Sequence, residues 1–196
     1  MTIERADRKL WAEARTLADL GEGMALWLEG EITSRPGYYG PTDLDSPELT
    51  ALCAALCRAG LVTDNSQQGG NWTYQGRDVW ARDAIDGFCD DTTLGRLHDA
   101  TWSTPLIVTA RRTKRRFRRH ASDGGRVSVT EVAGRIYTTF GGQMWPGCLD
   151  SIWDGIGKQA YREVLNAWHI AVVDPKWGRT DLLIDTLTSR FLAGVR

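Results

Sequence analysis

Short apolar segments alternate with amphipathic helical patterns along most of the chain, and this alternation limits the folds that it can adopt. Residues 84–89, 106–110 and 169–173 are short and nearly continuous in apolar side chains, as buried strands are. Helical patterns lie between them. The alternation predicts an α/β fold with layered helices around a largely parallel, short-stranded sheet. Residues 126–140 would add an antiparallel edge, and an α+β arrangement is the alternative.

The helix predicted over residues 46–60 carries the most complete set of signals. Ser46 is a capping residue, Pro47 suits the first helical position, and Gly60 suits the left-handed residue that ends a helix. An apolar stripe at helical spacing is formed by Leu49, Leu52, Cys53 and Leu56. Leu61–Thr63 then predicts a short strand that leads into a polar loop.

Other helices are expected from the same periodicity. A first helix is predicted over about residues 5–20 and is expected to end at Gly21 and Gly23. Further helices are predicted from residue 91 or 92, between residues 149 and 168, and over residues 181–192.

The length of 196 residues predicts a single domain, with residues 1–45 as a helical segment and loop packed on it. No apolar run approaches the roughly 18 residues of a membrane span, so no membrane partner is expected. The charged N-terminal segment differs from a secretory signal, which predicts a cytoplasmic protein. Oligomeric state cannot be inferred from these features.

Basic residues are concentrated in the segment 111–120, RRTKRRFRRH. Seven of the 24 Lys and Arg residues lie there, so 17 remain against 25 acidic residues elsewhere, a net charge of −8. The run from Arg111 to Arg119 could neutralise phosphates, and Phe117 could stack on a base. No recognised nucleic-acid motif accompanies it, so a solvated or structural face is the favoured interpretation.

The segment TDNSQQGG, after the first predicted strand, is the leading candidate for a site. Ligands in open parallel sheets bind beyond the carboxyl ends of the strands. Hydroxyl, carboxylate and amide groups are gathered in this segment by Thr63, Asp64, Asn65, Ser66 and Gln67. Gly69 and Gly70 would allow a ligand to approach the backbone, although a solvated loop would have the same composition.

Two further strand ends are expected to meet this segment. Asp90 follows the strand 84–89 and could bind a hydroxyl group or transfer a proton, unless it only caps the next helix. Asp174, Trp177 and Arg179 follow the strand 169–173. Arg179 could hold an anion and Trp177 could stack on a ring, whereas a tight turn is the structural alternative.

Established catalytic and metal-binding patterns are not found in the sequence. There is no G-x-S-x-G or H-E-x-x-H motif, and we predict no metal site. Cys53 and Cys57 are expected to be buried thiols without metal. The cofactor is unknown, and His169 could act as a general base near neutral pH, although this role is not favoured.

Four segments together resemble a known family: WAEARTLADLGEGMALWLEGEI, LCRAGLVTDNSQQG, ARDAIDGFC and AWHIAVVDPKWGR. They are similar to small actinobacterial-type proteins known as a domain of unknown function. The family would have Ser-Gln-Pro-Gly where this chain has Ser66-Gln67-Gln68-Gly69. The resemblance implies no activity.

We therefore expect the protein to bind a small polar metabolite, nucleoside- or nucleotide-like, at the strand ends. Asp64 and Asp90 would carry any proton transfer, and the other candidates would hold the ligand. Whether the protein is an enzyme stays open. The alternatives are an accessory protein that binds nucleic acid or protein through residues 111–119, and a purely structural or regulatory module.

Overall fold

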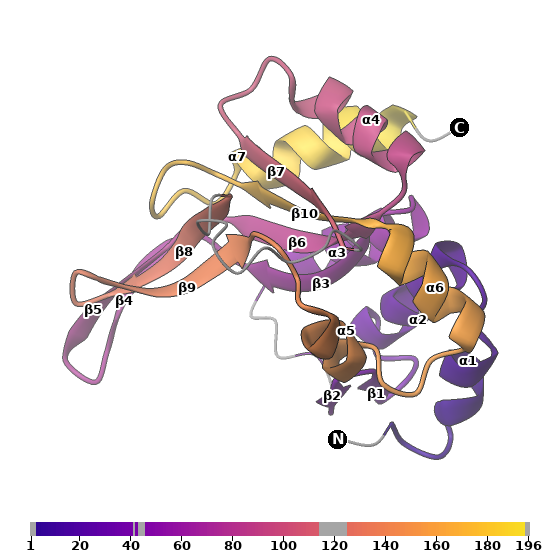
Figure 1. Ribbon diagram of the computed structural model, residues 1–196. Helices are drawn as coiled ribbons and strands as arrows, with labels where there is room; N and C mark the ends of the chain where they lie inside the picture. Colours follow the sequence, from indigo (N-terminus) through magenta and orange to yellow (C-terminus); the bar gives the residue numbers. More distant parts are fainter. Residues whose placement is uncertain (1–2, 41, 43–45, 114–124, 195–196) are drawn as a thin grey trace.

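The computed structural model describes residues 3–40, 42, 46–113 and 125–194. The structure combines helices with two four-stranded sheets and a two-stranded ribbon (Figure 1). The strands are β1 (Ser34–Arg35), β2 (Tyr38–Tyr39), β3 (Val62–Gln67), β4 (Gly70–Tyr74), β5 (Arg77–Ala81), β6 (Ala84–Cys89), β7 (Ile107–Arg112), β8 (Arg126–Val132), β9 (Arg135–Gly141) and β10 (Trp168–Val173). The helices are α1 (Arg8–Glu13), α2 (Leu17–Leu28), α3 (Pro47–Arg58), α4 (Asp91–Thr101), α5 (Pro146–Ile152), α6 (Lys158–Asn166), α7 (Leu182–Thr186), η1 (Leu187–Phe191) and η2 (Leu192–Gly194).

The main sheet has the order β3-β6-β10-β7, and all of its neighbouring strands are antiparallel. The prediction of a largely parallel sheet was therefore wrong, and the α+β alternative fits the molecule. The helical connection through α4 does bring β6 and β7 into the same direction. However, β10 lies between them and runs the opposite way. Helix–strand alternation predicts the crossover, but it does not reveal that the last strand inserts into the middle of the sheet.

The second sheet, β4-β5-β8-β9, is built from two hairpins and projects away from the helices (Figure 1). Its inner end packs on the main sheet through a small apolar cluster of Ala84, Val129, Phe140, Ala171 and Val173. The larger core lies between the main sheet and the helices. One face of the main sheet is thus covered by helices, and part of the other is covered by the second sheet.

The N-terminal helical segment differs from its prediction at Gly21. The chain forms two helices, α1 and α2, and α2 continues through Gly21 and Gly23. A β-carbon at Gly21 would clash with the carbonyl oxygen of Cys57 on α3. Gly21 therefore allows α2 and α3 to approach closely and does not end a helix.

Helix α3 confirms the capping signals in the sequence. The side chain of Ser46 accepts a hydrogen bond from the Leu49 amide, Pro47 occupies the first turn, and Gly60 has a φ of 95°. Within the described ranges, no helix combines the length and the apolar composition needed to cross a bilayer.

Candidate functional site

The segment predicted as a polar loop after residue 63 is instead a continuation of strand β3. The strand runs to Gln67, and its pairing with β6 is interrupted at Asp64. Thr63 pairs with Gly87 and Asn65 with Asp86, so Asp64 is the extra residue of a β-bulge. Bulges redirect side chains and often occur beside functional sites.

Asp64 forms a buried ion pair with Arg35 of strand β1. Arg35 Nη1 lies 3.0 Å from Asp64 Oδ1, and Nη2 donates to the Asp64 carbonyl oxygen at 3.2 Å. The exposed fractions of the two side chains are 12% and 3%. The guanidinium carbon also lies 5.1 Å from the ring of Trp27 and 5.8 Å from that of Tyr38. Arg35 is thus fixed by one carboxylate and two aromatic rings.

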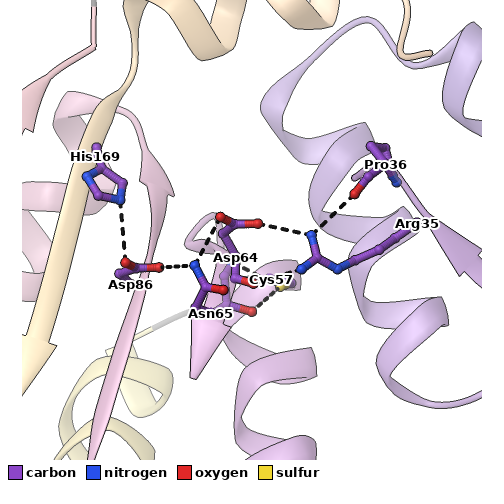
Figure 2. A network of polar contacts seen from close by, with 8 residues as sticks. Arg35, Pro36, Cys57, Asp64, Asn65, Asp86 and His169 are labelled. Atoms are coloured by element: carbon purple, nitrogen blue, oxygen red, sulfur yellow. Dashed lines mark hydrogen bonds and ion pairs between the residues drawn. The ribbon is translucent and has the colours of Figure 1, made fainter. Parts of the chain in front are cut away.

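A chain of polar contacts extends from Asp64 across the main sheet (Figure 2). Asn65 Nδ2 donates to Asp64 Oδ2 at 3.2 Å and to Asp86 Oδ1 at 3.1 Å. The other Asp86 oxygen lies 3.6 Å from His169 Nε2 on β10, an ion-pair distance longer than a good hydrogen bond. His169 Nδ1 lies 3.2 Å from the Gly142 carbonyl, which can only accept, so Nδ1 carries a proton.

Burial and charge act together on the two ends of this chain. Burial raises the pKa of Asp64, and Asp86 adds to this effect, while Arg35 opposes it. Burial by itself would lower the pKa of His169, but the carboxylate of Asp86 and the Gly142 carbonyl outweigh it and raise that pKa. Asp64 is therefore more readily protonated than an exposed aspartate, as a proton-transferring group requires.

A cavity of about 230 Å³ lies beside the Arg35–Asp64 pair. One part of its wall is polar and contains Arg35, Thr42, Thr63, Asp64, Asn65 and Ser66. The other part is apolar or aromatic and contains Met24, Trp27, Leu28, Tyr38 and Cys53. Ligand sites typically combine an apolar lining with a few convergent polar groups, and their volumes usually start near 300 Å³. This cavity therefore suits a small molecule.

The cysteines beside the cavity are not activated thiols. Burial raises the pKa of Cys53 to about 12 and that of Cys57 to about 11. Cys57 Sγ lies 3.2 Å from the hydroxyl oxygen of Thr63 and accepts from its amide. Thr63 therefore connects β3 to α3. The described ranges contain no cluster of three His, Cys, Asp or Glu side chains that could hold a metal ion.

The candidates Asp174, Trp177 and Arg179 form a separate cluster next to the end of β3. Arg179 donates from Nε and Nη2 to the two Asp174 oxygens at 2.6 and 2.7 Å. The guanidinium carbon of Arg82 lies over the ring of Trp177, 4.1 Å from the ring centroid. A β-carbon at Gly69 would clash with the Arg179 carbonyl. These contacts join the two strand ends, but none of the three candidates is among the residues that line the cavity.

Asp90 lies at the opposite end of the strands from Asp174 and Gln67. The end of β6 is beside the start of β3, because the two strands are antiparallel. Asp90 accepts the Thr93 amide at 2.7 Å and caps helix α4. The expectation that three strand ends converge was wrong, since it depended on a parallel sheet. Gln67, at the end of β3, contacts Thr130 of the second sheet and also lies outside the cavity lining.

Three members of the polar chain were missed in the sequence: Arg35, Asp86 and His169. Arg35 stands in a segment rich in Gly and Pro, and Asp86 lies inside an apolar strand. A carboxylate within a buried strand needs a partner, so Asp86 could have indicated a buried polar network from the sequence.

Of the basic run, the structure describes residues 111–113. Arg112 donates to Asp91 at 2.5 Å and to the Asn166 carbonyl at 2.7 Å, and it stacks on Trp168 at 4.3 Å. Arg112 thus has a structural role. Lys114, Arg115, Arg116, Arg118 and Arg119 lie outside the described residues.

A known protein family matches nearly the whole chain. A family model described as "Domain of unknown function (DUF6919)" matches residues 6–194. The chain belongs to this family. The resemblance to a domain of unknown function is thereby confirmed, while its actinobacterial character stays a prediction. No curated protein matches the chain.

Proposed function

We propose that the protein binds a small, uncharged, nucleoside-like metabolite in the cavity beside Arg35 and Asp64. The observation that carries the proposal is the buried ion pair at the wall of a cavity that is polar on one side and apolar or aromatic on the other. Two charges that leave water incur a large desolvation cost, which a purely structural contact repays poorly. The same pair is well suited to orient a polar ligand, since it is fixed by its surroundings before the ligand arrives.

The lining favours a planar ring that carries hydrogen-bonding groups. Trp27, Met24 and Leu28 offer apolar and aromatic surface, and Asp64, Asn65 and Ser66 offer polar atoms. A nucleobase combines both kinds of surface, since it has two apolar faces and a polar edge. Asp64 is the group that would exchange a proton with the ligand if the protein transforms it.

Charge argues for a nucleoside in preference to a nucleotide. Arg35 is already neutralised by Asp64, and a second carboxylate, that of Asp86, follows Asn65 along the polar chain. Arg179, the other candidate for an anion, is paired with both oxygens of Asp174. A phosphate would therefore have to displace a carboxylate from either arginine.

Calorimetry and thermal shift with cytidine, uridine, adenosine and inosine test the proposal. At about 100 times the dissociation constant, a ligand should stabilise the protein by about 2.7 kcal/mol. Asp64→Asn should weaken binding at least about tenfold, because a hydrogen bond to a charged group is lost. The milder Ser66→Ala variant should weaken it a few-fold.

The matched control is Asp90→Asn, because Asp90 is not among the residues that line the cavity. Asn caps helices as well as Asp does, so the fold should be preserved and binding unchanged. The proposal fails if none of the four nucleosides shifts the melting temperature. It also fails if Asp90→Asn and Asp64→Asn reduce binding equally.

A nucleic-acid role for residues 111–119 stays the alternative prediction. Among the described residues of the run, Arg112 is engaged by Asp91 and Trp168, which does not favour that role.

A further inference from the structure

The hydrogen-bonding capacity of the cavity wall specifies which edge a ligand must present. This inference rests on the proposed function and deepens it. It begins with Asn65, whose amide orientation is fixed by its neighbours. Its Nδ2 faces two carboxylate oxygens, of Asp64 at 3.2 Å and of Asp86 at 3.1 Å. Both neighbours are acceptors, so the amide nitrogen must point at them, and Oδ1 is left as an acceptor.

Asp64 adds further acceptor capacity next to Asn65. A carboxylate has about four acceptor positions. The Asp64 carboxylate receives Arg35 Nη1 on one oxygen and Asn65 Nδ2 on the other. Its side chain is only 3% exposed, and it lines the cavity. The remaining positions have no partner among the described residues and can receive a group inside the cavity.

Arg35 supplies a donor beside these acceptors. Its Nε is buried and has no hydrogen-bond partner among the described residues, whereas Nη1 and Nη2 are engaged. A buried N–H without a partner is unfavourable, and a ligand acceptor would supply the missing hydrogen bond. Arg35 lines the same cavity as Asp64 and Asn65. The wall thus combines an acceptor region with an adjacent unsatisfied donor.

We propose that the cavity recognises an amino group adjacent to a ring acceptor nitrogen, the edge shared by cytosine and adenine. The exocyclic amine donates to Asp64 and to Asn65 Oδ1, and the neighbouring ring nitrogen accepts from Arg35 Nε. The base lies against the part of the Trp27 ring that lines the cavity, and the indole nitrogen already donates to the Gly40 carbonyl at 2.8 Å. Uracil and hypoxanthine carry a carbonyl and an N–H at the same two positions. The carbonyl would face the acceptors of Asp64 and Asn65, and the ring N–H would face the N–H of Arg35.

The test is calorimetry with matched pairs, cytidine against uridine and adenosine against inosine. Each pair has the same sugar and ring system and differs at the recognised edge. The amino member should bind at least about tenfold more tightly, because a site built for hydrogen bonds leaves buried groups unpaired with the wrong partner. 3-Deazacytidine retains the amine but lacks the acceptor nitrogen, and it should bind several-fold more weakly than cytidine.

A variant pair tests the residues. Asn65→Ala removes the Oδ1 acceptor at an exposed position of β3 and should reduce the cytidine preference to within about threefold of uridine. Asn71→Ala makes the same change at an exposed position of β4, outside the cavity lining, and should leave the preference intact. Circular dichroism and melting temperature verify that both variants fold.

The outcomes separate this inference from the proposed function. Equal or tighter binding of uridine and inosine overturns the proposed edge while the nucleoside site stands. A preference that survives in Asn65→Ala overturns the assigned acceptor. Binding of none of the four nucleosides overturns the site and the edge together. An amino preference that is lost in Asn65→Ala and retained in Asn71→Ala supports the inference.

Discussion

Asp83 should limit the stability of the protein near neutral pH, and replacing it by Asn should remove that limit. The residue is fully buried in the link between β5 and β6. One carboxylate oxygen accepts the Gly69 amide at 2.5 Å, while the other has no partner among the described residues. Burial raises the pKa of Asp83 to about 6; the Gly69 amide opposes this shift, and the carboxylates of Asp174 and Asp181 add to it.

The size of the effect follows from the difference between the folded and unfolded states. An aspartate in an unfolded chain has a pKa near 3.9, so the shift is about two units, or about 3 kcal/mol. Between about pH 4 and pH 6 the folded state binds more protons than the unfolded state, and stability must fall as the pH rises. Asp83→Asn keeps the acceptor for Gly69 and replaces the unpaired oxygen by an NH₂ group. We expect it to stabilise the protein by about 1–3 kcal/mol at pH 7.5 and by close to nothing at pH 4.

Urea unfolding of both proteins at pH 4, 5, 6 and 7.5 measures this difference. Asp78→Asn is the control, because Asp78 is exposed on β5, and it should change stability by less than about 0.5 kcal/mol at every pH. The reasoning is refuted if Asp83→Asn is less stable than the wild type at pH 7.5. A difference that stays constant from pH 4 to pH 7.5 would refute it equally.

Two further predictions concern helix packing and the basic run. Gly21→Ala should lower the free energy of unfolding by about 2 kcal/mol or more, because the new β-carbon would clash with Cys57. Gly95→Ala, in open space on α4, should raise it by up to about 1 kcal/mol. Chemical denaturation measures both variants, and equal effects would contradict the assigned contact. We expect the quadruple Ala variant of Arg115, Arg116, Arg118 and Arg119 to lower stability and to leave nucleoside binding unchanged. Tight binding of a short DNA or RNA that falls roughly a thousandfold between 50 and 200 mM salt, and that is lost in the variant, would show the opposite.

Local elements could be predicted from the sequence where local physics determines them. The residues of β6 and the capped start of α3 agree with the structure because apolar continuity and capping chemistry act within a few residues. The strand direction could not be obtained in this way. It depends on β10 entering between β6 and β7, a long-range choice that leaves no local pattern. Gly21 shows the same limit, because its role depends on a contact with Cys57 of α3, which is distant in the sequence.

The candidate site was located in part for a reason that proved to be incorrect. Asp64, Asn65 and Ser66 were selected as a loop at the end of a parallel strand, and they line the cavity because of a bulge within an antiparallel one. Asp90 was selected by the same rule, but it lies at the opposite end of the strands from Asp174. Arg35 could not be found, because nothing in its own segment indicates a partner 29 residues away.

The polar chain from Arg35 to His169 has two ends that make different contributions. At the His169 end, the contact with Gly142 ties the main sheet to the segment after β9, and both His169 and Asp86 are shielded from the solvent. Apolar residues of similar volume could provide such a tie at no loss of stability, so stability by itself does not account for the charges. At the Arg35 end, the groups border a cavity, and Arg35 Nε has no hydrogen-bond partner among the described residues. The Asp86–His169 pair holds the Asn65 amide in one orientation, and this orientation determines which atom of Asn65 a ligand meets. Under the proposed function, the buried charges support the geometry of the wall that a ligand would meet.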